Sequence, residues 1–237
     1  MAKDPYVQND GILLNKLNIT NYDELNSAEK DITFSKFLNI EKTFTTNFDV
    51  KYVQSIHKHI FEDIYDWAGK LRTVPIYKEE VVIPGLSLDY SEPKNIKKEL
   101  TECLEKMNNI DWNSFPIDKK AEVFTQCLTE FWKIHPFRDG NTRTTLTFAN
   151  QFAKEHGFPI NLNFLLDQLV RKYDENGKIT QFSIRDKFVL SAIPKDFSPE
   201  PEHLTSLIHT AMVSGISKNI DNLKTSLSSK ENEHDER

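Results

Sequence analysis

The sequence predicts an all-α fold with a single β-hairpin, and three observations support this prediction. Apolar residues recur at three- and four-residue steps along most of the chain, which is the spacing that gathers them on one face of a helix. Only between Leu71 and Asp89 does the spacing change to the alternation of a strand. Glycine makes up only seven of the 237 residues, so few positions favour a break in a helix.

The helical spacing predicts a series of helices, and the segment 49–66 is the clearest of them because its apolar residues fall on one face. Segment 117–134 has an apolar face wide enough for a central, buried helix. A lead-in, residues 1–34, is expected to contain one or two helical turns around Tyr22–Lys30, capped by Asn21. The full set of expected helices is 35–47, 49–66, 92–109, 117–134, 141–157, 161–172, 178–192 and one around Leu204–Ala211.

The hairpin is expected at about residues 71–89, with a polar turn at 78–80 between two short apolar stretches. Pro75 and Pro84 lack the amide hydrogen that a central strand needs, so this hairpin should be an exposed edge element. Because an isolated hairpin is only marginally stable, it must lean on the helices. We call residues 71–89 the flap.

Four segments are expected along the chain. The lead-in is followed by the main domain, residues 35–195, and by a C-terminal helical segment, residues 196–224. The tail, residues 225–237, has almost no apolar content and is expected to be disordered.

Composition excludes several classes of function. Acidic residues outnumber basic ones, 36 to 30, and no basic block occurs, so nucleic acid is a poor candidate partner. No apolar run is long enough to span a bilayer, and residues 1–5 do not begin a signal peptide, so a cytoplasmic protein with no membrane partner is expected. Cys103 and Cys127 lie on apolar stripes and are expected to be buried thiols.

A polar loop between two apolar helices, residues 135–143, carries the chemistry, and we call it the signature loop. Pro136 disfavours helical geometry at His135 and so ends the preceding helix. Phe137 should anchor the loop in the core, and Gly140 permits a tight backbone. Asn141 and Thr142 then begin the next helix, where free N–H groups favour an anion.

A substrate that contains phosphate would use all of these groups. The helix start would hold phosphate oxygens, Arg143 would neutralise charge, Asp139 could hold a divalent cation and His135 could take a proton. Each residue alone has a structural explanation, such as a helix cap or a surface ion pair, but their combination has little structural necessity. His57 and His59 are expected at ordinary surface or boundary positions.

The sequence His135-Pro-Phe-Arg-Asp-Gly-Asn-Thr-Arg143 resembles the signature loop of Fic-domain proteins, written His-x-Phe-x-Asp/Glu-Gly-Asn-Gly-Arg-x-x-Arg. Residues 61–73, which run into the start of the flap, are similar to the segment that leads into the target-docking flap of that family. The resemblance covers about residues 10–195. It implies an all-α domain with a hairpin flap, and a protein adenylyltransferase that moves AMP from ATP onto a Tyr, Ser or Thr hydroxyl.

The resemblance also implies a role for each residue of the loop. His135 would be the general base, and Asp139 would hold Mg²⁺ between the α- and β-phosphates. Gly140 and Asn141 would line the anion hole, and Arg143 would grip the β-phosphate. The flap would dock the target protein by backbone pairing, and self-modification and homo-oligomer formation are left open.

Two positions depart from the family pattern. Thr142 replaces a glycine and adds a methyl group near the phosphates, and Leu146 replaces the second arginine. In the family that arginine contacts the γ-phosphate and pairs with a glutamate of an inhibitory helix. The segment Thr210–Gly215 fits the spacing of the inhibitory motif with Ser214 at the glutamate position, unless it is an ordinary helix that matches by accident. An enzyme without glutamate-based inhibition is therefore expected.

Two alternatives remain open at this point. Relatives that share the fold can transfer a phosphate or phosphocholine, and Leu146 favours this reading because it loosens the γ-phosphate end of the site. A nucleotide-binding module without catalysis is the second alternative, although such a module would not need His135 as a base.

Overall fold

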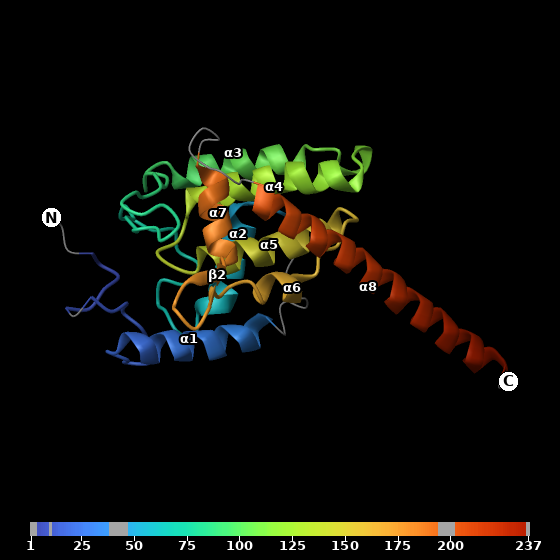
Figure 1. The fold of residues 1–237 in the computed structure, drawn as a ribbon, viewed down its shortest axis with the longest axis horizontal. Helices are drawn as coiled ribbons and strands as arrows, with labels where there is room; N and C mark the ends of the chain where they lie inside the picture. Colours follow the sequence, from blue (N-terminus) through green and yellow to red (C-terminus); the bar gives the residue numbers. More distant parts are fainter. Residues whose placement is uncertain (1–3, 10, 38–46, 194–201, 236–237) are drawn as a thin grey trace. The chain divides into compact units, whose positions relative to one another are not determined.

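The computed structural model describes residues 4–9, 11–37, 47–193 and 202–235, and helices dominate them (Figure 1). The chain divides into two compact units, one of Met1–Ile110 with Cys127–Phe148 and the other of Asp111–Gln126 with Ala149–Arg237. The first unit carries the whole signature loop, and the second carries the C-terminal helix α8. The prediction of a mostly helical fold is confirmed.

The first unit is built around α2 (Val50–Phe61). Asp49 caps this helix by accepting a hydrogen bond from the Tyr52 N–H at 2.8 Å, and Val53, Ile56 and Ile60 are completely buried on one face. The unit also contains α1 (Tyr22–Phe37), α3 (Ile96–Asn108), the end of α4 (Ile117–Ile134) and the start of α5 (Asn141–Glu155).

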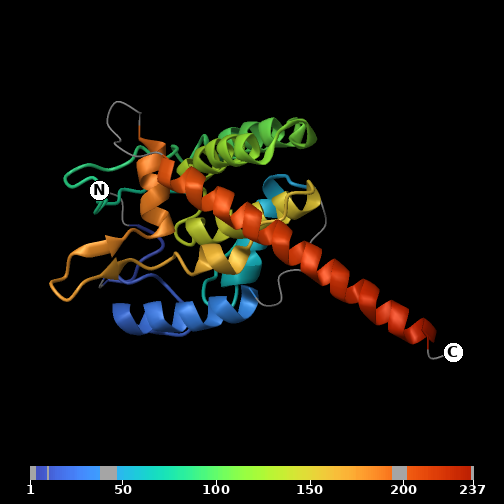
Figure 2. The ribbon, with the colours of Figure 1, turned by 45° about the vertical axis from the view of Figure 1, so that its right-hand side comes forward.

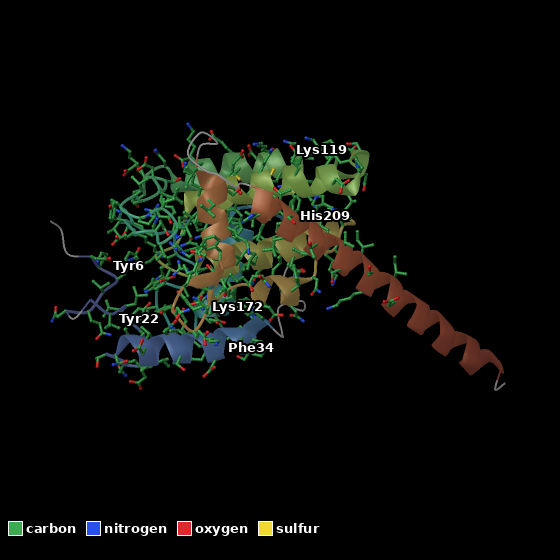
Figure 3. All side chains as sticks on the ribbon, viewed as in Figure 1. Tyr6, Tyr22, Phe34, Lys119, Lys172 and His209 are labelled. Carbon is green, nitrogen blue, oxygen red and sulfur yellow. The ribbon has the colours of Figure 1, made fainter. Side chains whose placement is uncertain are left out.

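Helix α1 is longer than the sequence predicts, at 16 residues. Its buried face consists of Leu25, Glu29 and Thr33, at steps of four, while Tyr22 and Phe34 are exposed (Figure 3). Two of its three buried side chains are polar, so hydrophobic periodicity could not reveal the full length of the helix. The helix expected at 35–47 lies mostly outside the described residues.

The second unit has an aromatic core. The rings of Phe124, Phe152 and Phe158 surround Trp112, with ring centroids 5.2 to 5.8 Å from that of the tryptophan. The elements of this unit after α5 are α6 (Leu162–Leu166), β1 (Lys172–Tyr173), β2 (Ile179–Gln181), α7 (Ile184–Ala192) and α8 (Glu202–Asp235), and the short 3₁₀ helix η2 (Trp112–Ser114) precedes them.

The antiparallel hairpin lies at residues 172–181 and not in the flap (Figure 2). The Asp174 carboxylate accepts hydrogen bonds from the N–H groups of Asn176 and Lys178, both at 2.9 Å, and Gly177 has a φ of +76°. This turn joins β1 to β2. The sequence predicts two helices here, 161–172 and 178–192, and the strands take the place of the end of the first and the start of the second.

The flap forms no strand in the structure, so the prediction of a β-hairpin at 71–89 is wrong in that respect. The flap instead folds into local turns. Hydrogen bonds from Ile83 N to Glu80 O and from Leu86 N to Ile83 O close two of these turns. Pro75 and Pro84 remove two amide donors from a segment that is already short, which explains why no ladder forms.

Helix α8 continues to Asp235, where the sequence predicts a disordered tail from residue 225. Residues 202–235 contain no proline and only Gly215, so nothing in the backbone chemistry ends the helix earlier. No helix within the described ranges has the length and apolar character to cross a membrane.

Candidate active site

His135 ends α4 in a left-handed backbone conformation, with a φ of +50°. Such a conformation is strained for a residue other than glycine, and strained residues cluster at active sites. The His135 side chain is almost fully buried, and its Nδ1 lies 3.2 Å from the carbonyl oxygen of Trp132. Because a carbonyl only accepts hydrogen bonds, Nδ1 carries the proton and the lone pair of the neutral ring lies on Nε2.

Tyr90, which follows the flap, packs against this imidazole. The two ring centroids are 4.2 Å apart, and the Tyr90 hydroxyl donates to Glu80 of the flap at 2.9 Å. Glu80 itself is fully buried. The flap segment is therefore connected to the histidine through one aromatic ring.

Arg72 holds the backbone of the signature loop at His135 and Pro136. Its Nε donates to the carbonyl of His135 at 2.8 Å, and its backbone N–H donates to the carbonyl of Pro136 at 2.9 Å. The terminal nitrogens Nη1 and Nη2 donate to the carbonyls of Val74 and Ser91, respectively. Burial lowers the pKa of Arg72, but the charge is spread over three carbonyl acceptors. Sequence analysis predicted no role for Arg72, because backbone atoms that accept a hydrogen bond leave no pattern in the sequence.

Asn141 closes the loop on itself. Its side-chain oxygen accepts from the Phe137 N–H at 2.9 Å, and its side-chain nitrogen donates to the Phe137 carbonyl at 2.8 Å. The side-chain oxygen and one side-chain N–H are occupied in this way, and Asn141 also has its backbone N–H to offer an anion. That group stands in the first turn of α5, where helix N–H groups have no intrahelical acceptor.

Gly140 has a φ of +76°, and a Cβ added there would collide with the ring of Phe61. Both the backbone conformation and the close approach of the ring require glycine at this position. The next hydroxyl, that of Thr142, accepts from the indole N–H of Trp132 at 3.0 Å. The threonine that replaces a glycine of the motif thus ties the start of α5 to the end of α4.

Asp139 is ionised in this loop. Burial opposes its charge, but the positive charges of Lys78 and Arg143 and the Gly140 N–H, 2.6 Å from the carboxylate, hold the pKa of Asp139 below its usual value. A carboxylate of this kind is a suitable ligand for Mg²⁺, which commonly takes one or two carboxylates together with substrate phosphates. Within the described ranges no group of three or more metal-binding side chains gathers anywhere.

His57 holds the other side of the loop, contrary to the expectation that it lies at the surface or a boundary. It is completely buried, its ring stacks on Phe137 with centroids 3.8 Å apart, and its Nε2 lies 3.0 Å from the carbonyl oxygen of Asp139. Phe137 is itself fully buried, as predicted. The signal that could have revealed His57 is its place on the apolar face of α2, four residues after Val53 and four before Phe61.

Arg143 extends from the first turn of α5 to α1. Its Nη2 pairs with Glu29, its Nη1 donates to the Thr33 hydroxyl at 3.2 Å, and its guanidinium lies over the Phe61 ring at 4.7 Å. Glu29 and Thr33 were not expected at the site, because they precede the loop by more than 100 residues.

Leu146, at the position of the second arginine of the motif, is completely buried. In the other unit, Ser214 accepts a hydrogen bond from the Asn161 side chain at 2.9 Å. A Cβ on Gly215 would collide with the backbone of Pro159 and Ile160. The last two residues of the segment Thr210–Gly215 thus have packing roles of their own.

The Fic/DOC family model matches residues 47–153, which include α2 and the whole signature loop. Protein adenylyltransferase VbhT of Bartonella schoenbuchensis is 29% identical over 165 residues, 68% of this chain and 33% of that protein. The probable protein adenylyltransferase y4lH of Sinorhizobium fredii is 27% identical over 169 residues, 68% of this chain and 83% of its own length. This chain thus aligns with a third of the Bartonella protein and with most of the Sinorhizobium one.

The fold also matches solved structures. The N-terminal Fic domain of a cell filamentation protein from Bartonella quintana, solved with bound ADP, superposes with a TM-score of 0.66 at 20% identity. The superposition covers 87% of this chain and 92% of that domain. At this identity the likeness establishes the fold.

Proposed function

We propose that this protein is an adenylyltransferase that moves AMP from ATP to a hydroxyl group of a protein, because the Fic/DOC family model matches residues 47–153. The observation that carries the proposal is the loop from His135 to Arg143, whose backbone is held by hydrogen bonds from the side chains of Arg72, His57 and Asn141. The relatives named protein adenylyltransferase support the same reaction.

In the proposed reaction, Nε2 of His135 takes the proton of a Tyr, Ser or Thr hydroxyl. The hydroxyl oxygen forms a bond to the α-phosphorus of ATP. The bond between that phosphorus and the oxygen bridging to the β-phosphate breaks, and its electron pair leaves with pyrophosphate. Holding the two reactants in line accounts for much of the rate, because phosphoryl transfer depends mainly on positioning and charge stabilisation.

The phosphates of ATP would lie over the start of α5. The N–H groups of Asn141 and Thr142 and the helix dipole would favour their negative charge there, Gly140 would line the same anion hole, and Arg143 would bind the β-phosphate. Asp139 would hold Mg²⁺, which would neutralise charge on the α- and β-phosphates. Phe137 would act only through its burial, by anchoring the loop.

The target would dock on the flap. The flap exposes three large apolar side chains, Tyr77, Val81 and Leu86, and forms no strand pairs of its own. An extended target segment would add beside this backbone and bring its hydroxyl toward His135. A second copy of the chain could serve as the target, which would be read as self-modification.

The proposed enzyme lacks inhibition by a glutamate. Leu146 is buried and carries no charge, so a glutamate supplied by another helix would find no arginine at that position. Leu146 also favours one alternative, a phosphotransferase that binds the nucleotide in another orientation, since the γ-phosphate loses a charged partner.

The test is to incubate the purified protein with Mg²⁺ and ATP labelled with ³²P at the α-phosphate, beside a His135→Ala variant. Label on the wild-type protein that disappears in His135→Ala is the expected result. Label from the γ-phosphate and not from the α-phosphate would instead establish the phosphotransferase. Full biological effect of His135→Ala would contradict both reactions and favour a binding module.

A further inference from the structure

Glu29 of α1 lies at the centre of a buried polar network that reaches the signature loop. One carboxylate oxygen, Oε1, accepts from Nη2 of Arg143, and the other, Oε2, accepts from the Tyr65 hydroxyl. Thr33, one turn further along α1, accepts from Nη1 of the same arginine. Three segments far apart in the sequence therefore meet at one carboxylate.

This network is largely closed to solvent. The side chains of Arg143 and Glu29 are 18% and 11% exposed, and Tyr65 is 1% exposed and stacks on Trp67 with centroids 4.3 Å apart. Burial, and then the neighbouring Glu29 charge, raise the pKa of Tyr65, so its hydroxyl remains a donor at any assay pH. A carboxylate buried in this way depends on its cation, because either charge left alone would be strongly destabilising.

The contacts also fix which way the arginine faces. A guanidinium has five N–H donors in one plane, and α1 takes one from each terminal nitrogen. The Phe61 ring lies 4.7 Å from the guanidinium carbon and supports one face of that plane. The plane is thereby set by α1 and α2 before any ligand binds, and the arginine keeps donors for a phosphate.

A competing possibility is that Glu29 occupies the arginine in place of a phosphate and so inhibits binding. The geometry argues against this, because both Glu29 oxygens have donors from within the fold and the pair is mostly buried. Removal of the carboxylate from Arg143 would leave a buried charge unpaired, which makes the pair a constant part of the fold.

We propose that Glu29 is a positioning residue that holds the Arg143 guanidinium in the orientation needed to bind a nucleotide phosphate, so that α1 completes the nucleotide site. The inference rests on the proposed function. It extends the site beyond residues 47–153, since Glu29 and Thr33 precede the matched segment.

The test compares Glu29→Gln with Asp31→Asn, an exposed carboxylate on the same helix. The affinity for a non-hydrolysable ATP analogue with Mg²⁺ is measured by calorimetry. Glu29→Gln should weaken binding by about tenfold, which corresponds to roughly 1.4 kcal/mol, and Asp31→Asn should leave it unchanged. Tyr65→Phe keeps the ring but removes one donor to Glu29, so it should weaken binding of the analogue by a smaller factor. This variant replaces Glu29→Gln in the test if Glu29→Gln folds poorly.

A double-mutant cycle with Arg143→Ala separates positioning from a purely structural role. In the Arg143→Ala background, Glu29→Gln should change the affinity no further, yet it should raise the Tm because it removes an unpaired buried charge. Tighter binding by Glu29→Gln alone, or an equal loss of affinity in both backgrounds, would overturn the inference. If the wild-type protein shows the α-phosphate label and Glu29→Gln binds the ATP analogue as tightly as the wild type, only this inference is refuted. If the wild-type protein binds no nucleotide, the proposed function is refuted as well.

Discussion

The imidazole of His57 donates from Nε2 to the carbonyl oxygen of Asp139, 3.0 Å away, while its Nδ1 accepts from the Gly69 N–H at 2.9 Å. A carbonyl can only accept and an amide N–H can only donate, so these two contacts fix one tautomer of the neutral ring. Burial lowers the pKa of His57 to about 3, which keeps the ring neutral in any ordinary buffer. The backbone of Asp139 is thus held by a histidine that lies 82 positions earlier in the chain.

His57→Ala should therefore loosen the signature loop. The change removes two buried hydrogen bonds and the ring stacked on Phe137, and should lower the free energy of unfolding by about 2 to 4 kcal/mol. Denaturant unfolding measures this, with His59→Ala as the control on the same helix, where a half-buried side chain and its 3.3 Å contact with the Lys36 carbonyl are lost. Equal effects of the two variants would show that the contact with Asp139 contributes nothing.

Gly140→Ala should be much more harmful than Gly157→Ala. Both glycines have a positive φ, +76° and +78°, so each alanine would carry a strain of about 1 to 2 kcal/mol. Only at Gly140 would the new Cβ also meet the Phe61 ring, whereas nothing lies within 4 Å of the Cβ built at Gly157. We expect Gly140→Ala to abolish labelling and Gly157→Ala to retain it, and equal labelling by both would contradict the close approach of Phe61.

Arg72→Lys should destabilise the loop although it keeps the charge. A lysine cannot reach the carbonyls of His135, Val74 and Ser91 together, and buried carbonyls left without donors cost about 1 to 3 kcal/mol each. Arg138→Lys is the matched control, because Arg138 pairs with Asp4 where both side chains are partly exposed. A Tm of Arg72→Lys as high as that of Arg138→Lys would argue against this support of His135.

Ser214→Glu should inhibit self-labelling only weakly, by less than about twofold. Tenfold inhibition would need a charge pair worth about 1.4 kcal/mol, and the new glutamate has no arginine of the motif to pair with. The position that would offer an arginine is the buried Leu146. Ser217→Glu, at an exposed position of the same helix, controls for the added charge. Strong inhibition by Ser214→Glu and none by Ser217→Glu would show that a glutamate can act without the second arginine.

The two cysteines should resist thiol reagents in the folded protein. Burial raises the pKa of Cys103 to about 12 and that of Cys127 to about 11, so very little thiolate exists at pH 8. The unfolded chain loses these protons near its ordinary pKa, about 8.5, so stability should fall as the pH rises above that value. Titration with a disulfide reagent should find both thiols only in denaturant, and rapid reaction of the native protein would contradict their burial.

Hydrophobic periodicity predicted the helices whose buried faces are apolar. The segment 117–134 matches α4 residue for residue, and the expected helices at 49–66, 92–109 and 141–157 correspond to the shorter α2, α3 and α5. The loop from His135 to Arg143 could also be recognised, because its chemistry lies within nine consecutive residues. The burial of Cys103 and Cys127 is confirmed for the same reason, since both fall on apolar faces.

The sequence by itself thus determined the mostly helical fold and the residues of the loop, since both depend on neighbours within a few positions. Only the tertiary structure decided what holds that loop: His57 on Asp139, Arg72 on His135, and Glu29 on Arg143, the last pair 114 residues apart. It also decided that the flap forms no strand and that the hairpin lies at residues 172–181. A buried polar partner adds nothing to the apolar periodicity of its own segment, and its role becomes recognisable only when folding brings the two segments into contact.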